Sequence, residues 1–405
     1  MITSRTKKIQ QQDIPKLRFK NFDDTWNEKE LGDLFIERSE RGGGEKYNLL
    51  SITLRDGIKK QESSNKTDNS SEDKSNYKIV RVGDIAYNTM RMWQGASGVS
   101  DLEGIVSPAY TVVKLKSGCV DFYKYLFKKP RTIFDFYRYS QGLTSDTWNL
   151  KYKHFSEVAV KIPDKQEQEK IASFLESVDK FIENLQTHKE YLLEYKKGMM
   201  QKIFSKEICF RDEKENLYPD WKKKKLSDFL IERNEQVPKS DQYPLMAFVA
   251  YKGVTPKGER YNREFLVNDN ENKKYKRTEY GDFIYSSNNL ETGSIGLNCF
   301  GFASISPVYS IFKITESCDH KFMGSYLVRK SFINKMIRYR QGVVYGQWKI
   351  HESDFLRIEE KIPSIEEQQK IADFLSAIDE LISIKREQIT NAEQWKKGLL
   401  QQMFV

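Results

Sequence analysis

The chain has 405 residues, a formal net charge of +9, and hydrophobic and charged fractions of 38% and 31%. This length predicts two to three domains, and the basic balance favours a polyanionic partner such as nucleic acid. No apolar run reaches the length of a membrane span, the N-terminus has no secretory h-region, and the four cysteines and four histidines lack zinc-binding spacing, so we expect a cytoplasmic protein without a metal site.

In chain order, a polar tail over residues 1–14 is followed by a first globular domain over 15–160. The stretch Trp26–Arg38 predicts a short strand and a helix. An aromatic-rich helical stretch, "DFYKYLFKKPRTIFDFYRY", comes after three β-rich stretches at Tyr47–Ile52, Tyr77–Asn88 and Ala109–Leu115. This mixture of strand and helix signals predicts a mixed α/β domain with a substantial sheet.

A long helix is predicted over 161–205. Asp164 follows a proline and stands three residues before Glu167, which is the capping-box pattern for a helix start. A seven-residue apolar period then begins, and sustained heptads are typical of a coiled coil. The residues that we assign to helix pairing are Ile171, Phe174, Val178, Phe181 and Leu185.

The rest of the chain repeats this plan. "WNEKELGDLFIERSE" at Trp26 returns as "WKKKKLSDFLIERNE" at Trp221, "YKIVRVGDIAY" as "YKRTEYGDFIY", and "KIPDKQEQEKIASFL" as "KIPSIEEQQKIADFL". Matching residues stand 195 to 200 positions apart, so the chain is a tandem duplication. The second copy comprises a globular domain over 206–360 and a helix over 361–405, whose pairing residues are Ile371, Phe374, Ile378 and Leu381.

A single helix cannot bury such an apolar stripe by itself, so we expect the two long helices to pair with each other. The predicted fold class is α+β: two mixed α/β domains joined by a long antiparallel two-helix coiled coil, with pseudo-twofold internal symmetry. The alternative is that each helix packs on its own domain as ordinary core.

The loop between a shared tyrosine and a shared glycine has the same length in both copies but different contents. It reads "NTMRMWQ" in copy one and "SSNNLET" in copy two. Arginine pairs bidentately with guanine, and asparagine or glutamine with adenine. The loops therefore predict base reading in double-stranded DNA, and the alternative is that they are ordinary solvated turns. The candidates are Asn88, Arg91, Trp93 and Gln94 in copy one and Ser286, Asn288 and Asn289 in copy two.

A second group of polar residues lies where "RYSQG" in copy one matches "RYRQG" in copy two. Residues on a mostly shared stretch cannot explain two different sequence preferences, so we expect them to hold DNA phosphate or to frame the loops. These DNA-binding candidates are Arg138, Gln141, Arg338, Arg340 and Gln341.

No motif in the sequence predicts catalysis. There is no Walker-type G-x-x-x-x-G-K-[ST], no N-P-P-[YF] of an amino methyltransferase, no H-E-x-x-H and no G-x-S-x-G. We therefore expect no catalytic residue and no cofactor held by this chain.

The doubled motif K-I-P-x-x-x-E-Q-x-K-I-A-x-F-L, closed by "YKKGMMQKIF" and "WKKGLLQQMF", resembles the DNA-specificity (S) subunit of type I restriction–modification systems. The resemblance covers roughly residues 15–405. It implies that each domain is a target-recognition domain for one half of a bipartite, asymmetric DNA site, and that the paired helices set the spacer between the halves.

The resemblance also implies partners. They are double-stranded DNA, two methyltransferase (M) subunits docked on the helices, and restriction/translocase (R) subunits, with no membrane. S-adenosylmethionine, ATP and Mg²⁺ are then expected on the partner subunits, and this chain is expected to be a non-catalytic subunit for DNA methylation and restriction.

Two other readings remain open at the level of sequence. One is a non-enzymatic coiled-coil adaptor whose two globular domains bind proteins. The other is a DNA-processing enzyme with an unrecognised active site. DNA retention separates the adaptor from the specificity subunit, and activity of the purified chain alone would identify the enzyme.

Overall fold

The computed structural model describes residues 14–42, 47–54, 57–63, 73–238, 240–257, 274–343 and 347–405. The expected polar tail over 1–14 lies, apart from Ile14, outside the described residues. The chain divides into two units, residues 1–188 with 385–405, and residues 189–384. Each unit therefore contains one globular domain, the first part of one long helix and the last part of the other. No helix in the described ranges is long and apolar enough to cross a membrane.

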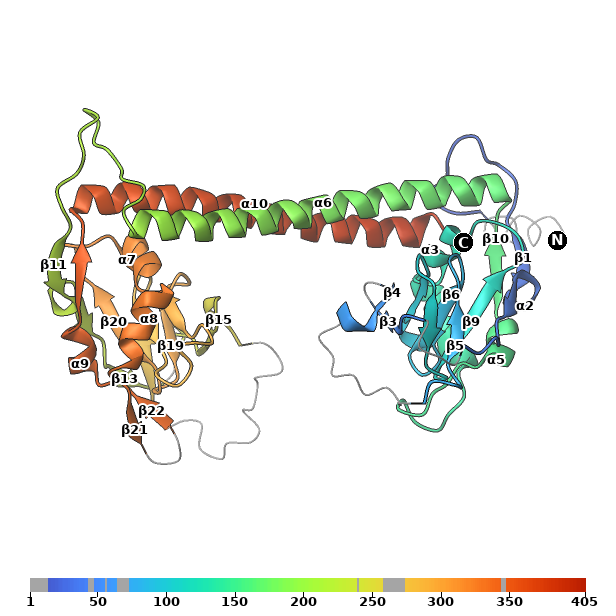
Figure 1. The fold of residues 1–405 in the computed structure, drawn as a ribbon, viewed down its shortest axis with the longest axis horizontal. Helices are drawn as coiled ribbons and strands as arrows, with labels where there is room; N and C mark the ends of the chain where they lie inside the picture. The colour runs from blue at the N-terminus through green and yellow to red at the C-terminus, as the bar shows by residue number, and fades with distance from the viewer. Residues whose placement is uncertain are drawn as a thin grey trace. The chain divides into compact units, whose positions relative to one another are not determined.

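The globular domain of unit 1 is built on a four-stranded antiparallel sheet in the order β2-β9-β6-β7, with three further strand pairs, β1–β10, β5–β8 and the hairpin β3–β4 (Figure 1). The strands are β1 Asn27–Glu30, β2 Phe35–Glu37, β3 Leu50–Thr53, β4 Gly57–Lys60, β5 Lys78–Val80, β6 Ile85–Asn88, β7 Ser97–Val99, β8 Gly104–Val106, β9 Tyr110–Leu115 and β10 Ala159–Ile162. The helices are α2 Leu31–Leu34, η1 Gln61–Ser63, η2 Met92–Gln94, α3 Val120–Leu126, α4 Pro130–Tyr139, α5 Tyr152–Ser156 and the start of α6 Lys165–Phe204.

The globular domain of unit 2 repeats this plan. Its four-stranded sheet has the order β12-β20-β17-β18, beside the three-stranded β13-β16-β19 and the pairs β11–β23, β14–β15 and β21–β22. The strands are β11 Lys222–Lys225, β12 Leu230–Glu232, β13 Gln236–Val237, β14 Met246–Val249, β15 Gly253–Pro256, β16 Tyr275–Thr278, β17 Phe283–Tyr285, β18 Ile295–Leu297, β19 Ala303–Ile305, β20 Ser310–Ile314, β21 Gln341–Val343, β22 Gln347–Lys349 and β23 Glu359–Ile362. The helices are η3 Leu226–Asp228, α7 His320–Tyr326, α8 Lys330–Ile337, α9 Glu352–Leu356 and α10 Ile365–Gln402.

An aromatic core holds the short helices on the sheet in each domain. In unit 1, Phe155 of α5 stacks on Tyr87 of β6, with ring centroids 5.1 Å apart. In unit 2 the matching residue, Phe355 of α9, lies 4.9 Å from Tyr285 of β17. Because Phe155 and Phe355 are fully buried, each fixes the strand that leads into the loop with the predicted base readers.

The first turn of each long helix explains the shared E-Q of the motif. The side chain of Asp164 accepts a hydrogen bond from the Glu167 N–H at 2.8 Å, as the capping pattern predicts. The Glu167 carboxylate is buried and instead accepts two hydrogen bonds from Arg18, at 2.8 and 2.7 Å. The buried Gln168 amide donates to the Pro163 carbonyl at 2.9 Å and accepts from the Cys119 N–H at 3.0 Å, which ties the helix start to α3.

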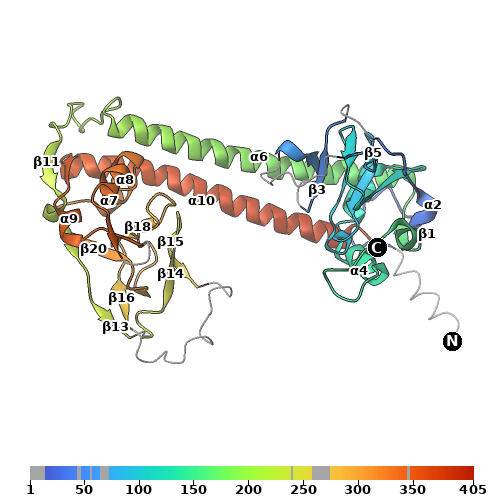
Figure 2. The same ribbon diagram turned by 60° about the horizontal axis from the view of Figure 1, so that its bottom comes forward.

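Within each unit, the start of one long helix lies beside the end of the other (Figures 1 and 2). In unit 1, Phe174 of α6 meets Trp395 of α10 edge to face at 6.3 Å. In unit 2, Lys196 of α6 donates to both oxygens of Asp379 of α10, at 2.6 and 2.7 Å. Low numbers on one helix meet high numbers on the other, so the helices pair antiparallel and the predicted α+β fold class is confirmed.

The buried seam differs from the predicted one at two positions. Ile171, Val178 and Leu185 of α6 and Ile371 and Ile378 of α10 are buried, but Phe181 and Leu381 are 51% and 50% exposed. The second buried residue of each heptad is instead the one that follows four positions after Ile171, Val178, Ile371 or Ile378. The apolar stripe is wide enough that either of two neighbouring residues could have filled this place. These buried residues are Leu175, Ile182, Leu375 and Ile382.

Candidate nucleic-acid interface

The loop after β6 and the matching loop after β17 have the same backbone frame. The Asn88 N–H bonds the Ala96 carbonyl at 2.9 Å, and the Ser286 N–H bonds the Ser294 carbonyl at the same distance. Each loop ends in a glycine of positive φ, 82° at Gly95 and 86° at Gly293. Fixed ends with different side chains between them are what two readers of different sequences require.

Each loop is anchored in the same way below its exposed side chains. Met92 in the first loop and Leu290 in the second are fully buried. The Leu150 N–H then bonds the Thr89 carbonyl at 2.9 Å, and the matching Ile350 N–H bonds the Ser287 hydroxyl at 3.0 Å. The intervening side chains are thus displayed from a rigid base.

A groove of about 750 Å³ in unit 1 gathers the predicted readers. One wall is the loop, and the opposite wall is the end of β3, with Thr53 and Leu54. Tyr110 at the start of β9 and Asp146 also contribute to the lining. The four predicted readers that line it are Asn88, Arg91, Trp93 and Gln94.

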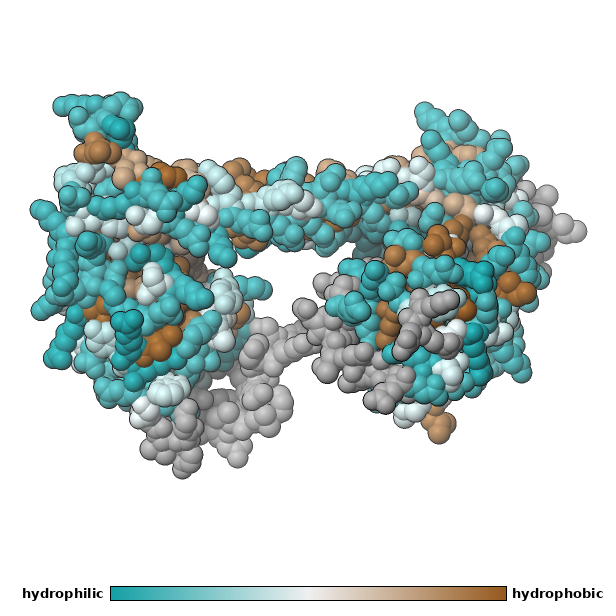
Figure 3. All heavy atoms as spheres, in the orientation of Figure 1, coloured by the Kyte–Doolittle hydropathy of each residue, from teal (hydrophilic) through white to brown (hydrophobic). Residues whose placement is uncertain are grey.

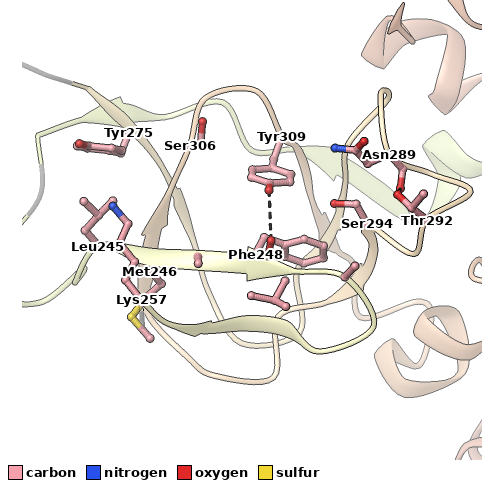
Figure 4. A pocket seen from close by; sticks show the side chains of 13 residues that line it. Leu245, Met246, Phe248, Lys257, Tyr275, Asn289, Thr292, Ser294, Ser306 and Tyr309 are labelled. Atoms are coloured by element: carbon pink, nitrogen blue, oxygen red, sulfur yellow. Dashed lines mark hydrogen bonds between the residues drawn. The ribbon is translucent and has the colours of Figure 1, made fainter. Parts of the chain in front are cut away.

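Unit 2 has a groove of about 530 Å³ in the matching place. Asn289, Thr292 and Ser294 line it from the loop, and hairpin β14–β15 lines the other side (Figure 4). Figure 4 shows Tyr309, the counterpart of Tyr110, over Phe248, with the tyrosine hydroxyl 3.3 Å from the Phe248 carbonyl oxygen. Where the first groove has Arg91 and Gln94, this one has Asn289 and Thr292, and Lys257 also lines it.

The remaining predictions for unit 1 concern four side chains. The exposed Arg91 side chain has no hydrogen-bond or ion-pair partner in the part of the chain that the structure describes, so its five donors are available. Trp93 donates from Nε1 to the Met90 carbonyl at 2.9 Å. Arg138 lies outside the groove and pairs with Asp135 at 3.7 Å, and Gln141 donates to the Tyr139 carbonyl at 3.3 Å.

In unit 2 several predicted residues are engaged within the domain. Ser286 is buried, and Asn288 accepts a hydrogen bond from the Trp348 N–H at 2.6 Å. Arg340 is almost fully buried and donates to both oxygens of Glu291 at 2.7 and 2.6 Å. Ser286 and Asn288, predicted as base readers, are thus engaged within the domain, whereas Asn289 lines the groove.

Two further predicted residues lie near this frame. Gln341 at the start of β21 lies 3.5 Å from an Asp354 oxygen, and Arg338 at the end of α8 is exposed. Within the described ranges Arg338 has no hydrogen-bond or ion-pair partner, so it remains a candidate for phosphate contact.

The aspartate of the shared "GD" sequence, which precedes β6 in unit 1 and β17 in unit 2, stabilises the domain fold. The buried Asp84 accepts from the Arg81 N–H at 2.8 Å and pairs with Arg38 at 2.6 Å, a bond that raises the pKa of the arginine. In unit 2, Asp282 makes the matching ion pair with Arg233 at 2.9 Å, and burial raises the pKa of this carboxyl group. Both arginines are therefore used within the domain.

The described residues contain no cluster of histidine, cysteine, aspartate or glutamate able to hold a metal ion. Nothing in the geometry of the two grooves resembles a nucleophile, a base and an orienting group brought together.

Comparison with known proteins decides the family. The family model described as "Type I restriction modification DNA specificity domain" matches the chain twice, over residues 23–194 and 218–394. The chain belongs to this family. Each match contains one globular domain and most of the long helix that follows it, so the duplicated specificity domain is the repeat seen in the sequence.

Relatives support the same assignment of the specificity subunit. The putative type I restriction enzyme MjaX specificity subunit of Methanocaldococcus jannaschii is 26% identical over 349 residues, covering 81% of this chain and 79% of that one. The MjaVIII specificity subunit of the same organism is 25% identical over 344 residues, covering 80% and 78%.

Solved structures agree on the fold. The S subunit of a type I restriction–modification system from M. genitalium has a TM-score of 0.56 and 14% identity, covering 97% of this chain and 99% of that one. A second chain, from work on complex assembly and conformational transition of the type I R-M system, has a TM-score of 0.52 and 15% identity, covering 94% and 97%.

Sequence reasoning predicted a β-rich stretch at Tyr47–Ile52 but did not place the hairpins that form one wall of each groove in this specificity subunit. The hairpins β3–β4 and β14–β15 pair in the same register, Ile52 with Ile58 and Phe248 with Val254. Their sequences have little in common apart from one signal, a turn glycine of positive φ, 68° at Gly57 and 73° at Gly253. The alternating apolar residues before these glycines could have identified the hairpins.

Proposed function

We propose that each half of this specificity subunit reads one half of a bipartite, asymmetric double-stranded DNA site. The observation that carries the proposal is the pair of matching grooves, which have one backbone frame and different polar linings. Arg91 and Gln94 offer groups suited to guanine and adenine in one groove, and Asn289 offers an amide suited to adenine in the other. The net charge of +9 suits the DNA backbone.

The long helices set the spacer between the half-sites in this proposal. Each is a single helix, of 40 and 38 residues, that begins in one unit and ends in the other. At a rise of 1.5 Å per residue each is roughly 60 Å long. A change in helix length should therefore change the spacer.

Two methyltransferase subunits dock on the helices. The exposed Phe181 and its match Leu381, and the exposed Trp395 and its match Tyr195, give each unit one apolar pair on its helices. Figure 3 shows apolar side chains at the surface of the helices among polar ones. Equivalent patches suit two copies of the same partner.

The chemistry belongs to those partners. S-adenosylmethionine is bound by the methyltransferase subunits, and ATP and Mg²⁺ are bound by the restriction/translocase subunits that join them. The specificity subunit contributes no catalytic residue.

The decisive experiment is methylome sequencing of a host that carries the chain with its methyltransferase subunit. The expected result is one bipartite motif with a fixed gap, absent when the chain is omitted. Methylation without a motif, or no DNA retention by the assembled complex, would contradict the proposal, and the latter would favour a protein-binding adaptor.

A further inference from the structure

The carbonyl oxygens of the matching glycines Gly95 and Gly293 are each held by a donor outside their own loop. In unit 1 the Nζ of Lys128, just after α3, donates to the Gly95 carbonyl. In unit 2 the backbone N–H of Tyr251, in the turn of hairpin β14–β15, donates to the Gly293 carbonyl at 3.0 Å. The same acceptor is therefore used in both halves, but the donors differ.

Lys128 also joins the loop to the opposite wall of its groove. Its Nζ donates to the Ser97 carbonyl at 2.9 Å and lies 3.4 Å from the carbonyl oxygen of Leu54, where strand β3 ends. An ammonium group has three donors and no acceptor, so these three carbonyls use its full capacity. All three donors of Lys128 are therefore engaged within the domain, and none is left for a DNA phosphate.

Unit 2 makes the same connection without a lysine. The residue that matches Lys128 is Val328, which has no donor. There the hairpin turn reaches the loop directly, with Tyr251 at a φ of 61° and its ring against Gly293, where an added Cβ would lie 2.3 Å from a ring atom. The link between hairpin and loop is common to both grooves, although the groups that form it are not.

We propose that Lys128 is a positioning residue that sets the specificity of the first half-site without touching DNA, by fixing the Asn88–Gln94 loop against hairpin β3–β4. This rests on the proposed function, in which that loop reads bases. Base discrimination requires the reading side chains to be held to a fraction of an ångström, and a rigid support supplies that precision. Without the clamp, Arg91 and Gln94 would sample several positions relative to the base edges.

The test uses the full chain assembled with its methyltransferase subunit and reads the base preference at every position of both half-sites from the methylome. Lys128→Met removes the donors and keeps the length of the side chain. Lys128→Arg keeps charge and donors, and Lys124→Met, on an exposed neighbour in α3, is the matched control. Lys128→Gln, with one amide group, provides a graded variant should the methionine variant fail to fold.

Lys128→Met is expected to reduce discrimination at the first half-site tenfold or more and to leave the second half-site and the gap unchanged. Lys128→Gln should fall between it and the wild type, and Lys128→Arg and Lys124→Met should keep the original preference. An unchanged first half-site, or a uniform loss of methylation with the base preference intact, overturns the clamp. Arg91→Ala, measured in parallel, separates the positioning role of Lys128 from the base-reading role of the loop. A base preference that survives Arg91→Ala refutes the proposal that this loop reads bases.

Discussion

The Nζ of Lys196 on α6 lies 2.6 Å from the Oδ1 of Asp379 on α10. The residues 200 positions away, Lys396 and Asp179, form the same ion pair at the other crossing of these two helices. Exposed ion pairs contribute little to stability, roughly 0.2–1 kcal/mol. Their repetition at matching positions instead reports the antiparallel register of the two helices.

This register gives a sharp test of the spacer. Removal of seven residues from α6 alone, between Asp179 and Lys196, should move one ion pair out of register and abolish or alter recognition of the original gap. Removal of matching heptads from both helices preserves both ion pairs and shortens each helix by about 10 Å. The double deletion should therefore keep both half-sites and reduce the gap, as read by methylome sequencing. A double deletion that keeps the original gap would refute the role of the helices as a spacer.

Arg91 and Arg138 should separate base reading from backbone contact. Arg91 lines the groove and has no partner among the described residues, whereas Arg138 lies outside it on α4. Arg91→Ala should weaken binding to the correct first half-site by about 1–3 kcal/mol relative to a base-substituted site if it reads a guanine. Arg138→Ala should weaken binding to all sequences alike and reduce the salt dependence. Binding titrations on matched duplexes at two salt concentrations measure both effects, and equal loss on all sequences from Arg91→Ala would assign that residue to phosphate.

The sequence predicts the backbone elements of this protein better than its side-chain contacts. The duplication, the helix start at Asp164 and the position of the variable loops follow from local patterns and from comparison of the two copies. Whether Arg340 faces DNA or Glu291 is decided by a residue 49 positions away, which no local pattern reports. The choice between Phe181 and Ile182 for the seam likewise depends on the facing helix, because both fit the same apolar stripe.

The Arg340–Glu291 pair predicts a pH dependence in unit 2. Hydrogen bonding to Arg340 lowers the pKa of Glu291 below its ordinary value of 4.5. A carboxyl group with a lowered folded pKa stabilises the fold above its unfolded pKa, and that contribution is lost as the pH falls through the folded pKa. The free energy of unfolding of the wild type should therefore fall relative to Glu291→Gln between pH 6 and pH 3. Urea titrations across this range measure the difference, and the control is Glu316→Gln, at an exposed residue with no ion-pair partner among the described residues. Parallel curves would show that the pair contributes nothing.

Lys128 predicts a second pH dependence, in unit 1 and at alkaline pH. Burial lowers its pKa from 10.5 to about 8, and the positive charges of Lys396 and Lys124 lower it further in the same direction. Between pH 8 and 10.5 the unfolded chain binds the proton and the folded chain does not, so this group makes the fold more stable as the pH rises through that window. The full shift of the Lys128 pKa corresponds to at most about 3 kcal/mol.

The free energy of unfolding of the wild type, minus that of Lys128→Met, should therefore increase from pH 7 to pH 10. Lys129, whose pKa is also lowered to about 8, titrates in both proteins and cancels in the difference. Urea titrations at half-unit steps measure this difference, and a flat result would mean that the Lys128 ammonium is not buried among the carbonyls of Gly95, Ser97 and Leu54.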